Sequence, residues 1–276
     1  MKMLLAVAAQ LLILTTATCS SAQTLLAGTV VAIRTPLGIH VGADSKVMAL
    51  RGNPSVGFAC KIRQFQNLFF AYAGLSGDVA SGFSVPEIAI MAHSNSSRIS
   101  DTVRNFEQLI TGPLAVNIGQ LRKEQPALYK KSLEDRPLLS IVFFGIENEG
   151  LVLYTRSFNA KDSAEGQPLI DIQRHNCPGD CPNGTTYVFL GEKQAINRFV
   201  DANPHYFAIG FVPTIQTLIQ LEIADKPDLV APPMISCVST WLAQIGFKES
   251  RSVLNETAKR RGHGGENGTR TFLFRG

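Results

Sequence analysis

The order of strand-like and helix-like segments is the feature that most constrains the fold of this chain. Short runs rich in β-branched and aromatic residues precede a helical region, and the same alternation then repeats. Each half can therefore lay helices over a sheet, and the two sheets can pack face to face. We predict strands over 29–34, 39–43, 61–65, 68–73, 138–146, 151–158, 169–174, 187–190, 235–240 and 271–274.

Four helical regions separate these strands. The first is predicted over 85–93, with Pro86 in its first turn. Asp101 is a suitable N-cap for the second, which we expect Gly112-Pro113 to interrupt before a further helical run to about Leu133. The last two are predicted over 192–201 and 213–224.

Length and composition fit a single large domain. The chain has 276 residues, of which 45% are hydrophobic, enough for one substantial core. Only 17% are charged, which argues against a largely disordered chain. The net charge is +4, and the sequence has no basic stretch interleaved with aromatic residues, so we expect no nucleic-acid partner.

The first segment has the pattern of an export signal. Lys2 supplies a positive charge, residues 3–14 form an apolar run too short to span a bilayer, and Ser20-Ser21-Ala22 offers small residues for cleavage. We therefore predict a signal peptide over 1–22, a mature chain starting near Gln23, and a secreted or periplasmic location. No later run reaches transmembrane length, so no membrane partner is expected after removal of the signal.

Cysteine usage agrees with export. Four cysteines remain after the predicted cleavage: Cys60, Cys177, Cys181 and Cys237. An even number in a secreted chain suggests disulfides, and Cys177 and Cys181 flank a short turn that one bridge could close. His175 nearby also suggests zinc, but four well-spaced ligands are not evident. We favour a disulfide or free thiols, and predict neither a metal nor a cofactor.

Two stretches carry a resemblance to a known family. Residues 28–45 read as a β-hairpin with an acidic residue at its far end, and residues 60–78 begin with a lone lysine and end in a small-residue turn. Together they resemble the opening of a proteasome-type N-terminal-nucleophile hydrolase. The resemblance implies an α+β fold, a four-layer αββα sandwich of two packed antiparallel sheets flanked by helices, over residues 28–250. Residues 251–276 would form a polar, partly disordered tail.

The resemblance also implies a site. In this family the hydroxyl of an N-terminal threonine attacks a carbonyl, and its own amine, with an unperturbed pKa of about 7.7–8.0, takes the proton. Thr29 then corresponds to the nucleophile, Lys61 and Asp44 to the supporting ion pair, and Gly74 to the amide at the oxyanion site. Individually, Asp44 could end a strand, Lys61 could protect a sheet edge and Gly74 could serve a turn. Their joint spacing favours a shared site.

The position of the nucleophile leaves two functions open. When the sequence is aligned without gaps to the family pattern, Gly28 takes the position of the nucleophile, and the Thr29 side chain points to the opposite face of its strand. A one-residue bulge near Pro36 would instead bring Thr29 to the position of the nucleophile. Glu192 and Ala231 stand where the family often has hydroxyl residues. The chain is therefore predicted to be either a threonine-type peptide or amide hydrolase, activated by cleavage before Thr29, or a catalytically silent member. A silent member would bind a partner or self-assemble as a homo-oligomer.

Overall fold

The computed structural model describes one compact unit of the chain. The described residues are 23–26, 28–49, 56–78, 81–127, 129–130, 137–163, 167–181, 184–204, 206 and 210–230. The chain divides into two units, Met1–Ala243 and Gln244–Gly276, and every described residue belongs to the first. The predicted signal peptide over 1–22, the strands predicted over 235–240 and 271–274 and the tail over 251–276 lie outside the described residues.

The described part is a mixed α/β protein whose larger sheet has nine strands. These are β1 (Gln23–Leu26), β4 (Lys46–Ala49), β5 (Val56–Phe58), β6 (Ile62–Phe65), β7 (Leu68–Asp78), β8 (Phe83–Ser84), β9 (Leu139–Glu147), β10 (Gly150–Asp162) and β11 (Pro168–Cys177). They are arranged in the order β11-β10-β9-β7-β1-β4-β5, with β6 and β8 also paired to β7. All these pairings are antiparallel.

The smaller sheet contains β2 (Thr29–Arg34), β3 (Ile39–Ala43) and β12 (Thr186–Gly191), in the antiparallel order β12-β2-β3. The predicted hairpin between β2 and β3 is present. Its turn is closed by Thr35, whose amide donates to the Gly38 carbonyl at 2.8 Å and whose hydroxyl accepts from the Gly38 amide at 3.0 Å. A threonine hydroxyl that satisfies the turn amides explains why this sequence reverses here.

The four described helices are α2 (Val85–Ser94), α3 (Ile99–Glu124), α5 (Gln194–Ala202) and α6 (Phe211–Asp225). They match the predicted helical regions, with shifts at their ends. Among the described residues, no helix has both the length and the apolar character needed to cross a membrane.

The prediction for α3 was wrong in two details. Its N-cap is Arg98, and Asp101 lies inside the first turn, where its carboxylate binds Arg98 and Arg104. The helix also continues through Pro113 instead of breaking there. The missing amide of a proline removes one helical hydrogen bond, but packing of an apolar face can outweigh that loss. That buried face comprises Val103, Phe106, Ile110, Leu114 and Ile118.

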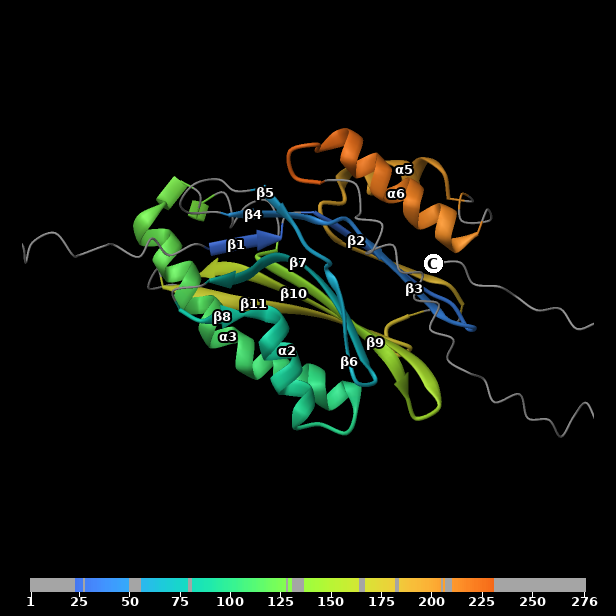
Figure 1. Ribbon diagram of the computed structural model, residues 1–276, viewed down its shortest axis with the longest axis horizontal. Coiled ribbons are helices and arrows are strands. Elements are labelled where there is room, and N and C mark those ends of the chain that lie inside the picture. Colours follow the sequence, from blue (N-terminus) through green and yellow to red (C-terminus); the bar gives the residue numbers. More distant parts are fainter. Residues whose placement is uncertain are drawn as a thin grey trace, which may run out of the picture. The chain divides into compact units, whose positions relative to one another are not determined.

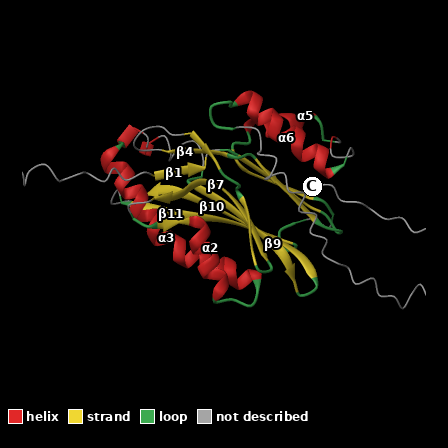
Figure 2. Ribbon diagram, in the orientation of Figure 1, coloured by secondary structure: helices red, strands yellow, loops and turns green. Residues whose placement is uncertain are grey.

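Three hydrophobic clusters show how these elements are layered (Figures 1 and 2). One joins α2 and α3 to the larger sheet, a second lies between the two sheets, and a third joins α5 and α6 to the smaller sheet. Strand β2 contributes Val30 and Ala32 to the second cluster and Val31 and Ile33 to the third, so both of its faces are buried. The layers therefore run helices, larger sheet, smaller sheet, helices, which is an α+β sandwich.

The strands predicted within the described residues are all present, but the turn predicted over 73–78 is wrong. Strand β7 continues through this small-residue segment to Asp78 and pairs there with β1 and β8. Pairing with neighbouring strands thus outweighs the weak strand preference of glycine and serine. Strands β1, β4, β5 and β8 were not predicted. The expected disulfide joins Cys177 to Cys181, and Cys60 is a free cysteine.

Candidate functional site

A buried ion pair between Lys61 and Asp44 forms the centre of the candidate site. Asp44 directly follows β3 and Lys61 directly precedes β6, and the Lys61 ammonium binds Asp44 Oδ1. Both side chains are fully buried, with 0% exposure. Lys61 therefore does not protect an exposed sheet edge, which was the structural alternative for this residue. The two hairpins bring together the carboxylate and the ammonium that the sequence had placed seventeen residues apart.

Burial and charge act in opposite directions on Lys61. Removal from water lowers the pKa of the Lys61 ammonium below its ordinary value, and the Asp44 carboxylate opposes this effect. An ion pair in a low-dielectric interior is retained only when further hydrogen bonds offset the loss of hydration.

Two backbone amides supply such hydrogen bonds to Asp44. The Thr29 amide donates to Oδ1 at 2.7 Å, and the Lys46 amide donates to Oδ2 at 3.1 Å. The Asp44 amide in turn donates to the Thr29 carbonyl at 3.0 Å. The carboxylate thus links the start of β2, the start of β4 and Lys61, which precedes β6.

Gly28 is the residue whose α carbon faces this ion pair. It has a φ of +133°, a backbone conformation that residues with side chains rarely adopt. A β carbon placed on Gly28 would overlap both Asp44 Oδ1 and Lys61 Nζ. The ion pair therefore packs against bare backbone, and the position has no hydroxyl.

Thr29 is buried and its hydroxyl has another partner. The hydroxyl donates to the Glu192 carbonyl at 2.7 Å. Because successive side chains of an extended chain point in opposite directions, a Gly28 that faces the ion pair leaves Thr29 directed away from it. The β2–β3 register runs unbroken from Arg34↔Ile39 to Val30↔Ala43, so the bulge considered near Pro36 is not present.

A second glycine closes the other side of Gly28. Gly191 has a φ of +75°, and a β carbon there would overlap the Gly28 carbonyl oxygen and lie 2.9 Å from the Ala73 β carbon. The Glu192 amide donates to that same Gly28 carbonyl at 2.9 Å. In the sequence, residues 190–192 were notable only because they depart from the pattern of the resembled family. A glycine directly after a predicted strand was the available signal for close approach of two backbones.

The fourth predicted residue, Gly74, lies next to this region but within strand β7. It pairs with Leu26 of β1 on one side and with Leu139 of β9 on the other, and its φ is +109°. A β carbon on Gly74 would overlap the Leu138 carbonyl oxygen. Its conformation therefore serves the close packing of β7 against the chain that enters β9.

Strand β1 was missed by the sequence reasoning and holds the residues just before the site. It lies between β7 and β4, with Thr24 opposite Gly77 and Ala49, and it ends two residues before Gly28. The backbone on the N-terminal side of Gly28 is thus part of the larger sheet.

No model of a known protein family matches this chain, and no curated protein matches it significantly.

Proposed function

We propose that this protein is a catalytically silent relative of the proteasome-type N-terminal-nucleophile hydrolases, with the αββα arrangement of that family, and that it acts by binding or self-assembly. The observation that carries the proposal is the contact of Gly28 with the Asp44–Lys61 ion pair. A nucleophile needs a hydroxyl or thiol beside its activating groups. Gly28 has neither, and its surroundings exclude a β carbon.

The course of the chain before Gly28 supports the same proposal. Strand β1 begins at Gln23, the residue at which we expect the mature chain to start, and it pairs with strands on both sides. Cleavage between Gly28 and Thr29 would separate β1 from the rest of the chain. A protein that relies on β1 to fill its sheet is expected to keep this peptide bond.

In a silent protein the ion pair has a positioning role. The Asp44 carboxylate binds Lys61 and the amides of Thr29 and Lys46, so it fixes the junctions of three strands. Such a buried pair adds little net stability compared with apolar residues, but removal of one partner is costly. The pair would then act as an anchor for the N-terminal part of the fold.

A threonine hydrolase remains the second candidate, and one contact favours it. The Thr29 backbone nitrogen lies 2.7 Å from Asp44 Oδ1, the oxygen that also binds Lys61. If cleavage freed this nitrogen, the new amine would lie beside the ion pair, where a family member needs its base. The hydroxyl would then have to leave the Glu192 carbonyl.

Hydrolysis assays on the secreted protein distinguish the two candidates. Wild type, Thr29→Ala and Thr29→Ser are compared on a panel of fluorogenic peptides and simple amides. The silent protein is expected to show no turnover above that of Thr29→Ala, with all three chains starting at the same residue. Turnover that is lost in Thr29→Ala and kept in Thr29→Ser would contradict the proposal, as would a wild-type chain that starts at Thr29.

Light scattering tests the self-assembly form of the proposal. The outer helices expose apolar side chains, with Met91 47%, Leu109 38% and Val116 57% accessible. Leu109 and Val116 are seven residues apart on α3 and share one face of that helix. If a second copy covers this face, wild type is expected to be oligomeric and Leu109→Lys/Val116→Lys monomeric. A monomeric wild type at high concentration would exclude self-assembly and leave binding to a different partner.

A further inference from the structure

Strand β11 and the turn after it bring together three side chains of the kinds that can bind a metal ion, His175, Cys177 and Cys181. His175 and Cys177 are two residues apart on β11 and therefore lie on one face of that strand. The following turn returns Cys181 to them. It is held by the Asp180 amide, which donates to the Asn176 carbonyl at 2.6 Å, and by the Asn176 amide, which donates to Asp180 Oδ2 at 2.7 Å.

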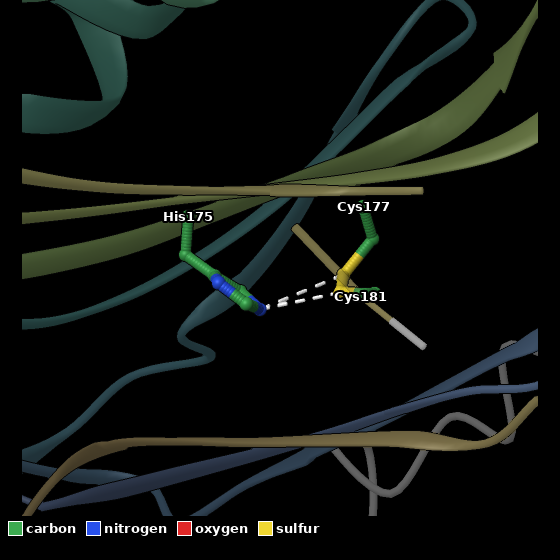
Figure 3. A group of neighbouring side chains, drawn as sticks. All are labelled: His175, Cys177 and Cys181. Carbon is green, nitrogen blue, oxygen red and sulfur yellow. Dashed lines mark hydrogen bonds between the residues drawn. A yellow bond between two sulfur atoms is a disulfide. The ribbon is translucent and has the colours of Figure 1, made fainter. Parts of the chain in front are cut away.

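The imidazole of His175 points at both sulfur atoms (Figure 3). Its Nε2 lies 3.2 Å from Cys181 Sγ and 3.7 Å from Cys177 Sγ. All three candidate ligand atoms lie within 4.8 Å of one another. Tetrahedral Zn²⁺ with bonds of roughly 2.3 Å to sulfur and 2.0–2.1 Å to nitrogen separates N and S ligands by about 3.6 Å. The observed separations bracket this value.

The disulfide alone leaves the position of His175 unexplained. A bridge between Cys177 and Cys181 uses only the two sulfur atoms, and a disulfide sulfur is a poor hydrogen-bond partner for imidazole. Two thiolates and a neutral imidazole, by contrast, are the ligand set that Zn²⁺ prefers. Cys177 is fully buried, whereas His175 and Cys181 are partly accessible, so an ion could reach the group from solvent.

We propose that His175, Cys177 and Cys181 form a redox-gated Zn²⁺ site. In the oxidised protein the disulfide closes the site. A dithiol or phosphine reductant supplies two electrons, the Sγ–Sγ bond breaks, and each sulfur takes up one proton. Zn²⁺ then binds as both thiols release their protons to water, with His175 as the third ligand. The fourth coordination position stays open to water or to an external ligand.

The position of this site at the end of β11 indicates which part of the fold a bound Zn²⁺ would stabilise. Cys177 is the last residue of β11, the strand from which the chain leaves the larger sheet on its way to β12 of the smaller sheet. Cys177 and Cys181 also pack in the apolar cluster between the two sheets. Either the disulfide or a bound ion would fix this crossover. An ion that binds only the folded protein also raises its stability.

Metal titration of the full-length mature chain tests the proposal. A background variant with Cys60→Ser and Cys237→Ser confines the thiols to the pair. The phosphine-reduced protein is titrated with Co²⁺ as a spectroscopic probe and then with Zn²⁺ as competitor. We expect one equivalent of Co²⁺, a thiolate-to-cobalt charge-transfer band, displacement by Zn²⁺, and no binding after reoxidation to the disulfide.

Two variants distinguish a metal site formed by all three ligands from nonspecific binding of metal to the cysteine thiols. His175→Ala keeps both cysteines and their disulfide, and we expect its affinity to fall by more than the roughly 10–100-fold typical of changes around the ligands. Cys181→Ser leaves one thiolate, so the charge-transfer band should weaken and the affinity for Co²⁺ should fall. Equal Co²⁺ affinity in His175→Ala and the background variant would overturn the proposal. So would a reduced, folded protein that binds no ion, or a reduced protein whose circular dichroism shows that it unfolds before metal is added.

Discussion

Gly28 is held by contacts on two sides that leave no space for a side chain. Asp44 and Lys61 lie where its β carbon would be, and the backbone of Gly191 and Glu192 packs against its carbonyl. Its positive φ adds a second reason for glycine. The site therefore depends on the absence of a side chain at Gly28 as well as on the Asp44–Lys61 ion pair.

Replacement of Gly28 by alanine is expected to destabilise the protein by about 3 kcal/mol or more, because backbone strain adds to displacement of a buried ion pair. Gly119→Ala is the matched control. Gly119 lies inside α3, and an added β carbon there would be 3.9 Å from Pro168 Cγ, an ordinary van der Waals contact, so alanine should stabilise by roughly 0.5–1 kcal/mol. Urea denaturation measures both. A Gly28→Ala protein as stable as wild type would show that the site has room for a side chain.

The buried pair makes a separate prediction. Lys61→Met leaves the fully buried Asp44 carboxylate without its cation and should cost about 3–5 kcal/mol of unfolding free energy. Asp44→Asn should also be costly, since it removes the negative charge beside the buried Lys61 ammonium. The double variant Asp44→Asn/Lys61→Met should lose less than the sum of the two single losses. Additive losses would mean that the two groups do not depend on each other.

At the scale of secondary-structure elements, Glu107 joins α3 to the larger sheet. Its carboxylate binds Arg156 of β10, which is 8% exposed, and Arg174 of β11, which is half exposed. Burial of Glu107 opposes ionisation, but hydrogen bonds from Arg174 and Arg156 outweigh that effect and lower its pKa. The ionised carboxylate thus helps to seat a long helix on the sheet.

Glu107→Gln should destabilise the protein by about 3 kcal/mol, because the buried Arg156 guanidinium loses its counter-charge. Since the folded protein holds Glu107 ionised to a lower pH than the unfolded chain does, this contribution is present above the ordinary pKa of about 4.3 and is lost on acidification. Unfolding measured at several pH values should show the difference between wild type and variant shrinking in acid. Asp101→Asn, which removes exposed ion pairs on the same helix, should change stability little.

A carboxylate between the two C-terminal helices has the opposite pH dependence. Glu222 of α6 accepts a hydrogen bond from the Ile196 amide of α5 at 2.8 Å, and burial raises the pKa of this carboxyl. The folded state therefore keeps the proton to a higher pH, and stability falls as the pH rises from about 4.3 through the raised pKa. Glu222→Gln should lack this decline. Parallel pH–stability curves for wild type and Glu222→Gln would refute the assignment.

At the scale of the whole described unit, much of the architecture follows from local sequence pattern. The short β-branched run of β2 and the turn after Arg34 specify a hairpin, and helical spacing identifies α3 and α6. Stacking of these elements into four layers then follows from burial on both faces of β2.

The features that the sequence pattern did not predict depend on contacts between residues far apart along the chain. Strand β1 has only four residues, and its place between β7 and β4 is set by partners more than twenty residues away along the chain. The continuity of α3 through Pro113 depends on the sheet beneath it. For the site, Asp44 and Lys61 were singled out by the resemblance of residues 28–45 and 60–78 to a known family. The exclusion of a side chain at Gly28 was not predictable, because it requires Asp44 and Lys61 to meet against its α carbon in the folded chain.

We propose that the Asp44–Lys61 pair supports no nucleophile. Intact mass of the secreted protein, measured after incubation with an electrophile that acylates N-terminal threonine, tests this proposal. We predict one unmodified species that retains the residues of β1 and Gly28. A species that begins at Thr29 and carries a single adduct would contradict it.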